Sequence, residues 1–387
     1  MIFSEPALSA EDHKVLEILK RQRVRLKIAT QNNPRRWSGT LRKSTLARVI
    51  QGSNAIEGYN ASMDEAMAAV EDEPPLDERT ETWAAINGYR VAMTYIIQAA
   101  EDPYFEFNKQ FLKSLHFMMT QFDLTAHPGK WRPGEVRVVN DDTGAVVYEA
   151  PDVERVDPLI CELVEYLDNQ GHQSVIVAAA MAHLNLTMIH PFKDGNGRMA
   201  RALQTLVLAR EGVIHPLFSS IEEWLGRNTQ EYYNILGEVG KGSWNPSRTA
   251  LPWVRFCLKA HYQQANTLIR RYEEYESVFE SIEKLIAREK LMERMTIPLF
   301  NAALGIRVTN SRYQNETEES SYVAGRDLRI LSDAEILIPH GERRGRYYTA
   351  GKELKEARQR ARRDRTVLDP YELPEVAGAE SPRLPGL

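Results

Sequence analysis

The sequence contains only two cysteines, and it has no apolar run long enough to cross a membrane. Cys161 and Cys257 are too few and too far apart for a disulfide framework or a zinc site. A bilayer-spanning helix needs roughly 18 or more consecutive apolar residues. The N-terminal stretch "MIFSEPALSAEDHK" has acids and a proline where a secretory signal would be apolar. These absences predict a cytoplasmic protein with no membrane partner.

The chain has 387 residues, 43% hydrophobic and 27% charged, which is typical of a globular protein with two or three domains. Its net charge of −5 is unevenly spread. Residues 341–365 contain ten basic and four acidic side chains, so the rest of the chain carries −11. A basic segment on an acidic protein is typical of a local nucleic-acid site, or of a solvated helix.

Apolar residues recur at helical spacing along most of the chain, which predicts a mainly helical fold. The expected helices cover approximately residues 9–29, 44–58, 79–100, 107–121, 154–168, 174–189, 197–211, 227–239, 250–272 and 273–294. In residues 135–151, two β-branched runs flank the turn sequence "NDDTG" and predict a β-hairpin, whose edge can accept an extended peptide. Towards the C-terminus, two helices followed by a basic hairpin have the order of a winged helix-turn-helix.

The stretch "IHPFKDGNGRMAR", residues 189–201, combines several groups suited to phosphate chemistry. The apolar helix before it should end at His190, because Pro191 cannot continue the hydrogen-bond ladder. The glycines of "DGNG" allow the backbone to approach a ligand closely. The helix that begins near Gly197 then offers free N–H groups to an anion.

Charged side chains complete this pattern. Arg198 and Arg201 lie three residues apart on one helix face, so both can contact phosphate oxygens. Asp194 would repel a phosphate unless Mg²⁺ lay between them, and His190 is suited to removing a proton from an attacking hydroxyl. Asp-Gly and Asn-Gly pairs also form ordinary turns, and a histidine at a helix end is often structural. The residue chemistry does not identify the transferred group.

The run from His190 to Arg201 resembles the signature of the Fic family, H-P-F-x-D-G-N-G-R-x-x-R, at every fixed position. The resemblance implies a protein adenylyltransferase that transfers AMP from ATP to Ser, Thr or Tyr hydroxyls of protein substrates and of itself, with Mg²⁺. It implies that His190 is the general base and that Asp194 holds the metal. The positions implied to bind the phosphates of ATP are Asp194, Gly195, Asn196, Gly197, Arg198 and Arg201.

Two further segments match this family. The hairpin lies where Fic proteins have a flap that docks the target segment. Its candidate docking positions are Val138, Val139, Tyr148 and Glu149. The sequence "NTQEYYNIL" is similar to the family's segment beside the nucleoside, which implies that Tyr232 and Tyr233 line the adenosine pocket. Ordinary helix packing is the alternative for both tyrosines.

Residues 53–58, "SNAIEG", resemble the Fic inhibitory motif (S/T)-x-x-x-E-(G/N), with Ser53 and Glu57 at its fixed positions. The resemblance implies an inhibitory helix at about residues 44–58. If Glu57 pairs with Arg198, it occupies the arginine that the γ-phosphate needs and places a negative charge there. We therefore expect autoinhibition through this pair. In some relatives the same glutamate supports AMP removal, and the sequence leaves that activity open.

Resemblance and periodicity together predict an all-α Fic fold with a small hairpin flap, followed by a winged helix-turn-helix. The expected regions are an N-terminal helical region at 1–106, a Fic core at 107–272, the winged domain at 273–365 and a disordered tail at 366–387. The tail contains four prolines and few large apolar residues.

Two other functions compete with AMP transfer. One is a Fic-fold transferase of another phosphoryl group, such as a Doc-like kinase. The other is a DNA-binding regulator whose Fic domain senses a nucleotide. The arginines that suit DNA phosphates in the winged domain are Arg326, Arg329, Arg343, Arg344 and Arg346. A homodimer is left open, because Fic relatives often dimerise.

Overall fold

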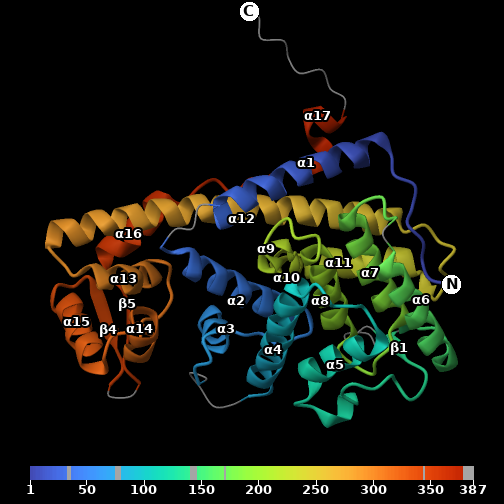
Figure 1. Cartoon of the computed structure of the whole chain (residues 1–387), viewed down its shortest axis with the longest axis horizontal. Coiled ribbons are helices and arrows are strands. Elements are labelled where there is room, and N and C mark those ends of the chain that lie inside the picture. Colours follow the sequence, from blue (N-terminus) through green and yellow to red (C-terminus); the bar gives the residue numbers. More distant parts are fainter. Residues whose placement is uncertain (33–35, 75–79, 140–145, 170, 343–344, 378–387) are drawn as a thin grey trace, which may run out of the picture. The chain divides into compact units, whose positions relative to one another are not determined.

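The computed structural model describes all residues except 33–35, 75–79, 140–145, 170, 343–344 and 378–387 (Figure 1). The chain forms two compact units. The larger comprises Met1–Asn32, Thr45–Asn266 and Val367–Leu387, and the smaller comprises Asn33–Ser44 and Thr267–Thr366. The helices α2 (Ser38–Ile56) and α12 (Leu251–Glu289) contribute residues to both units. Among the described residues, no helix combines the length and the apolar character needed to cross a membrane.

The larger unit is mainly helical, as predicted. Before the hairpin it contains α1 (Ala10–Lys27), η1 (Ile28–Asn32), α3 (Met63–Val70), α4 (Glu81–Glu101), α5 (Lys109–Thr120) and η2 (Leu124–Ala126). After the hairpin come η3 (Val153–Arg155), α6 (Val156–Asp168), α7 (Val175–Ile189), α8 (Asn196–Ala209), α9 (Pro216–Ser219), α10 (Glu222–Arg227) and α11 (Thr229–Gly240). The short helices α3, α9 and α10 carry too few periodic residues to be recognised from sequence.

The centre of this unit is α7, which packs against α6 and α8. Thirteen of its residues are buried, because its sequence is apolar on every face. Ser174 caps its N-terminus, and His190 ends it in the left-handed conformation, with φ 53° and ψ 58°. The predicted buried helix with His190 at its end is therefore confirmed.

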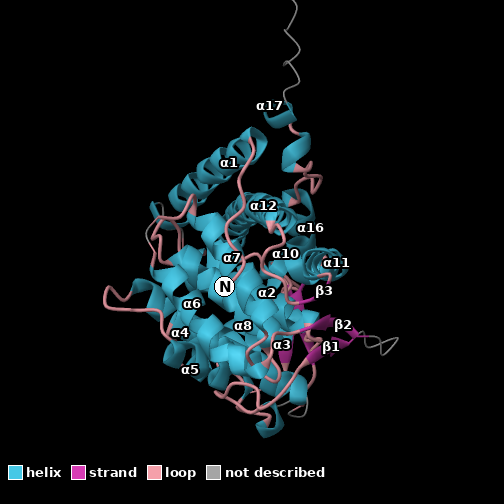
Figure 2. Cartoon of the chain, turned by 90° about the vertical axis from the view of Figure 1, so that its right-hand side faces the viewer, coloured by secondary structure: helices cyan, strands magenta, loops and turns pink. Residues whose placement is uncertain are grey.

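A small sheet interrupts the helices (Figure 2). The strands β1 (Arg137–Val139) and β2 (Val146–Glu149) pair antiparallel, as the hairpin pattern predicted. The expected turn at 140–144 lies outside the described residues. The short strand β3 (Gly242–Ser243) pairs parallel with β2, so β2 is the central strand. This third strand was not predicted, because two residues carry no alternating pattern.

The smaller unit contains, beyond its share of α2 and α12, η4 (Glu293–Met295), α13 (Thr296–Ala303), α14 (Asn310–Thr317), α15 (Ser321–Asp333), β4 (Leu337–His340), β5 (Tyr347–Ala350) and α16 (Lys352–Ala361). The strands β4 and β5 pair antiparallel, and Val308 forms an isolated bridge to Tyr348 on β5. Two helices followed by a hairpin were expected in this region. The wing residues Arg343 and Arg344 lie outside the described residues.

Two segments differ from the sequence expectations. Two helices were expected at 250–272 and 273–294, but the structure has the single helix α12. No glycine or proline lies near the expected boundary between Tyr272 and Glu273, so the helix continues through it. Residues 367–377, expected to be disordered, contain η6 (Pro370–Glu372) and α17 (Pro374–Ala377). They pack on α1, where Val376 is buried and the Tyr371 hydroxyl donates to Asp12. Few apolar side chains suffice here because an existing helix supplies the other face.

Buried histidines make the larger unit sensitive to acid. His183 on α7 is fully buried between Gln204 and Tyr232, and Gln204 also contacts His261. Burial lowers the pKa of both histidines to about 3. Below the ordinary value of 6.5, the unfolded chain binds protons that the folded chain does not. Stability is therefore full above pH 6.5 and falls as the pH falls below it.

When the pH falls from 6.5 to about 4.5, we expect each of these histidines to lower the free energy of unfolding by about 2 kcal/mol. Urea unfolding of the wild type and of His261→Gln at several pH values measures this. The variant should lose less stability on acidification than the wild type. Equal pH dependence of the two proteins would contradict the assignment.

Candidate functional site

The loop between α7 and α8 is held in one shape by its own backbone and by Asn196. Gly195 adopts φ 77°, a conformation that favours glycine, and it precedes the first residue of α8. The Asn196 side chain accepts a hydrogen bond from the Phe192 amide and donates one to the Phe192 carbonyl, both at 2.9 Å. The Asn196 side chain therefore braces the loop, while its backbone N–H, at the first position of α8, has no partner within the helix.

The ring of His190 is oriented so that it can act as a base. Its Nδ1 lies 3.2 Å from the Thr187 carbonyl, which can only accept, so Nδ1 carries the proton and Nε2 carries a lone pair. Burial is the largest cause that lowers the pKa of His190 below 6.5, and the positive charge of Arg132 acts in the same direction. The ring is therefore neutral near pH 7.

Arg132, which the sequence analysis missed, ties His190 to the hairpin. Its Nε donates to the His190 carbonyl at 3.0 Å, and its backbone amide donates to Pro191 at 2.8 Å. Its two terminal nitrogens donate to the carbonyls of Gly134 and Pro151, which flank the hairpin on either side. The guanidinium is almost fully buried. The position of an arginine before a predicted hairpin does not indicate such long-range contacts, so Arg132 could not be identified from the sequence.

His116 on α5 was also missed, and it fixes the other end of the loop. Its ring stacks on Phe192 with centroids 3.8 Å apart and an angle of 4°. Its Nε2 lies 2.9 Å from the Asp194 carbonyl, and its Nδ1 accepts from the Gly129 amide. Burial lowers the pKa of His116 to about 4, so the ring stays neutral and donates through Nε2. Phe192 itself packs in the core.

The two arginines of α8 are buried and still have N–H groups without partners. Arg198 donates to the Asp194 carboxylate at 3.3 Å, while its Nε and Nη1 find no hydrogen-bond partner in the described part of the chain. Arg201 donates to Ser53 and Glu57, while its Nη1 has no partner among the same described residues. Buried guanidinium groups with unpaired donors at a helix N-terminus form a site suited to an anion.

The predicted pair between Glu57 and Arg198 is wrong. Glu57 Oε1 accepts from Arg201 Nη2 at 2.6 Å, and Ser53 adds two more contacts to Arg201, at 2.8 and 3.0 Å. Arg198 is turned to Asp194 and lies 5.3 Å from the centre of the Tyr59 ring. The reason is the approach of α2, which ends beside the first turn of α8 on the Arg201 side.

Gly197 makes this approach possible. A Cβ atom on residue 197 would collide with Glu57 Oε1, so the carboxylate lies directly on the backbone at the start of α8. Burial opposes the ionisation of Glu57, but the charges of Arg201 and Arg198 outweigh it and lower the pKa of Glu57. A negative charge therefore already lies at the helix end that the anion site offers.

The two predicted adenosine residues have different surroundings. Tyr232 is buried, and its hydroxyl contacts His183 at 3.0 Å, so its polar group is used inside the core. Tyr233 is half exposed, and its hydroxyl donates to the Ile56 carbonyl at the end of α2. Of the two, Tyr233 presents its ring to solvent next to the Glu57 segment.

The predicted flap residues also divide into two groups. Val138 and Val139 lie on β1, the outer strand, which has no second strand partner among the described residues. Tyr148 and Glu149 lie on the central strand β2. The Tyr148 hydroxyl donates to the Met188 carbonyl at 2.8 Å and thereby fixes β2 to α7. An added peptide therefore has access to the backbone of β1, not of β2.

The carboxylate of Asp194 suits a magnesium ion that is held mainly by phosphates. Its side chain is 53% exposed, and it projects from the loop that carries His190. The described residues contain no group of three or more His, Cys, Asp or Glu side chains that would hold a metal alone. One carboxylate is sufficient when substrate phosphates and water provide the other ligands, as is usual for Mg²⁺.

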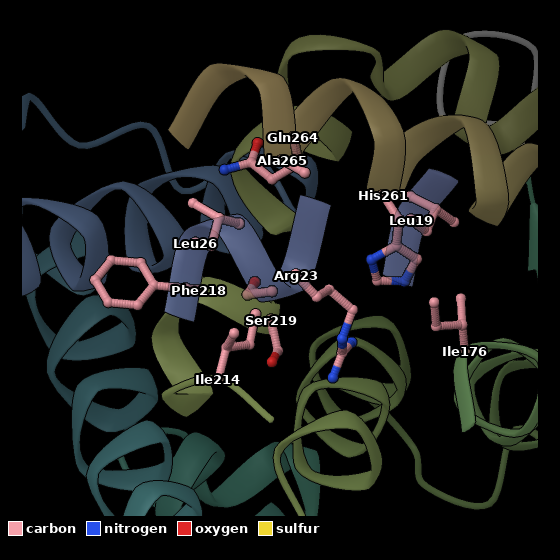
Figure 3. Close-up of a pocket in the computed structure, with 11 residues that line it drawn as sticks. Leu19, Arg23, Leu26, Ile176, Ile214, Phe218, Ser219, His261, Gln264 and Ala265 are labelled. Atoms are coloured by element: carbon pink, nitrogen blue, oxygen red, sulfur yellow. The ribbon is translucent and has the colours of Figure 1, made fainter. Parts of the chain in front are cut away.

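An internal cavity elsewhere in the larger unit is too small for a substrate. Its volume is 20 Å³, which corresponds to about one water molecule. Figure 3 shows side chains from α1 and α12 around it, among them Arg23 and His261. A nucleotide therefore does not fit into this cavity.

Residues 106–208 match the model of the Fic/DOC family. The protein adenylyltransferase fic-1 of Caenorhabditis briggsae is 30% identical over 141 residues, which cover 36% of this chain and 24% of that protein. The protein adenylyltransferase Fic of Nematostella vectensis is 25% identical over 208 residues, 51% of this chain and 44% of that protein. The chain thus spans less than half the length of these curated relatives.

Among solved structures, a Fic family protein from Desulfovibrio desulfuricans G20 superposes with a TM-score of 0.58. The match covers 90% of this chain and 98% of that chain at 19% identity. Fic-1 of Caenorhabditis elegans superposes with a TM-score of 0.53 at 22% identity, covering 68% of this chain and 72% of that chain. At these identities, the likeness concerns the fold.

Proposed function

Because this chain belongs to the Fic family, we propose that it is a protein adenylyltransferase that transfers AMP from ATP to protein hydroxyl groups. The observation that carries the proposal is the arrangement of one loop. His190, with a free Nε2, lies at one end of this loop, and unpaired donors of the buried Arg198 and Arg201 lie at the other. A base and an anion site on the same rigid loop are the parts that attack on a phosphorus atom requires.

In the proposed reaction, the oxygen of a target Ser, Thr or Tyr bonds to the α-phosphorus of ATP. The bond from that phosphorus to the leaving pyrophosphate breaks, and the hydroxyl proton passes to Nε2 of His190. The backbone N–H groups at Gly195, Asn196 and Gly197 stabilise the negative charge at the phosphorus. Mg²⁺, held by Asp194 and the phosphates, would neutralise part of that charge.

The two arginines are proposed to bind the β- and γ-phosphates. Their unpaired N–H groups fit these oxygens, since charged donors buried without partners are costly until an anion satisfies them. The target segment is proposed to add to the outer edge of β1, where Val138 and Val139 lie. The half-exposed ring of Tyr233 is the better candidate for a contact with the nucleoside.

Parallel incubations with α-labelled and γ-labelled ATP test this proposal. AMP transfer leaves label on protein only from the α position. Label retained only from the γ position would instead assign the Doc-like kinase activity. Binding of ATP without any protein labelling, in the wild type and in Glu57→Gly, would favour a nucleotide sensor.

The pH dependence of the reaction should follow His190. Because the base must be neutral, kcat/KM falls as His190 becomes protonated. Burial lowers the pKa of His190 below 6.5, so we expect the acid limb of the profile to lie below pH 6.5. The charge of Glu57 raises the pKa of His190, so the limb should move to lower pH in Glu57→Gly. Initial rates of AMP incorporation across the acid range measure both effects, and a limb above pH 6.5 would contradict them.

DNA binding by the smaller unit is the second candidate function. The order α13, bridge residue Val308, α14, α15, β4 and β5 supports a winged helix-turn-helix. Arg326 and Arg329 are exposed on α15, and Arg346 is exposed before β5. Binding to a random duplex DNA at several salt concentrations tests the proposal. Affinity should fall steeply with salt, and no binding at low salt would exclude it.

A further inference from the structure

A second cavity lies within the smaller unit. Its volume is 420 Å³, which is in the range of sites for small organic molecules. The end of α13 and the residues after it provide an apolar floor with Ala302, Ala303 and Ile306. The opposite lining comes from α16 and its C-cap, with the cationic side chains of Lys355, Arg358 and Arg362.

The three cations share one face of α16, because they are spaced by three and four residues. The acids of the same helix are engaged elsewhere. Glu353 pairs with Arg288 at 2.8 Å, and Glu356 lies 3.9 Å from both Lys352 and Arg360. Within the described part of the chain, no carboxylate lies at ion-pair distance from Lys355, Arg358 or Arg362.

Arg358 is the central cation of this lining. Its Nη1 is buried and has no hydrogen-bond partner among the described residues. Burial lowers the pKa of Arg358, and the charges of Arg362 and Arg271 add to this effect. Tyr275 and Glu274 act in the opposite direction, but Glu274 also accepts a hydrogen bond from the Arg363 amide. The cavity therefore has an excess of positive charge, with the side chains of Lys355, Arg358 and Arg362 in its lining.

We propose that this cavity binds a small anion with an apolar body, such as a medium-chain carboxylate. The carboxylate would satisfy Arg358 and balance the charges of Lys355 and Arg362. The alanines and Ile306 would cover the hydrocarbon part, which a bare inorganic anion does not need. The proposal is independent of AMP transfer, since no residue of the His190 loop takes part.

Isothermal titration of the full chain with sodium octanoate, below its micellar concentration, tests the proposal. Octanoate should bind saturably, and Arg358→Gln should weaken its binding by about ten-fold or more, the effect of losing a charge-assisted hydrogen bond. Arg360→Gln is the matched control, since it removes the same charge from another face of α16 and should leave the affinity unchanged. Octylamine, with the opposite charge, should not bind.

Hydrogen exchange provides a test that needs no variant. Octanoate should slow exchange in α13, β5 and α16. The proposal is overturned if octanoate does not bind saturably, or if its protection lies only in other elements. Equal weakening in both variants overturns it as well, and so does binding of inorganic phosphate as tight as that of octanoate. Should Arg358→Gln fail to fold, Arg358→Lys retains the charge and should keep most of the affinity.

Discussion

His190→Ala should reduce AMP transfer by about a hundred-fold to ten-thousand-fold, the contribution typical of a positioned general base. The structure gives the reason. Nδ1 of His190 is committed to the Thr187 carbonyl, and Nε2 is the ring nitrogen left to accept a proton. Alanine removes that acceptor without disturbing the hydrogen bonds from Arg132, which go to backbone carbonyls. The loop should therefore keep its shape while losing its base.

The measurement is incorporation of label from α-labelled ATP, made in the Glu57→Gly background so that the starting activity is high. His13→Ala serves as the control, because His13 is an exposed histidine on α1. It should leave the rate unchanged. If His190→Ala kept more than about a tenth of the parent activity, another group would have to be the base.

Glu57→Gly should raise AMP transfer by about ten-fold to a hundred-fold, the equivalent of one or two charge-assisted hydrogen bonds. Glu57 occupies Nη2 of Arg201, and its charge lies against Gly197 at the start of α8. A phosphate placed there would face a buried carboxylate instead of a free guanidinium. With glycine at position 57, one N–H of Arg201 Nη2 is released, while the other still donates to the Ser53 carbonyl.

The autoinhibition proposed here thus acts through Arg201, and Ser53 supports it. Ser53→Ala removes the Oγ contact to Arg201 but keeps the contacts of the Ser53 carbonyl and of Glu57, so it should produce a smaller rise than Glu57→Gly. Glu17→Gly is the control for a lost ion pair, because Glu17 pairs with Lys20 on the exposed surface of α1. Equal rates of AMP transfer by Glu57→Gly and the wild type, with saturating ATP and Mg²⁺, would contradict the proposed autoinhibition.

The local features of this site follow from neighbouring residues in the sequence, and its partners do not. The end of α7 at His190 is predictable because Pro191 stops the helix within the same stretch. The choice of Glu57 between Arg198 and Arg201 depends on how α2 approaches α8, which involves residues more than a hundred positions apart. Both arginines lie on one helix face, so their spacing alone could not distinguish them.

The same limit explains the two missed residues. His116 and Arg132 act on the loop through the backbone carbonyls of Asp194 and His190. Every residue type has a backbone carbonyl, so the sequence does not indicate which residues accept such contacts. The helix α12 is longer than either of the two helices predicted in its place. Its sequence has no glycine or proline between Trp253 and Glu289, so helix-forming residues continue across the predicted boundary.

In the proposed reaction, the hydrogen bonds of Arg132 would bear on how a target protein is selected. Because one buried guanidinium fastens both ends of the hairpin to the His190 loop, the outer edge of β1 is preorganised before any target arrives. The docking proposed for β1 would then cost little ordering entropy on the side of this chain, so most of that cost would come from the incoming segment. Targets whose modified hydroxyl lies in an already extended, unstructured stretch should consequently be preferred over those that must unfold to present it.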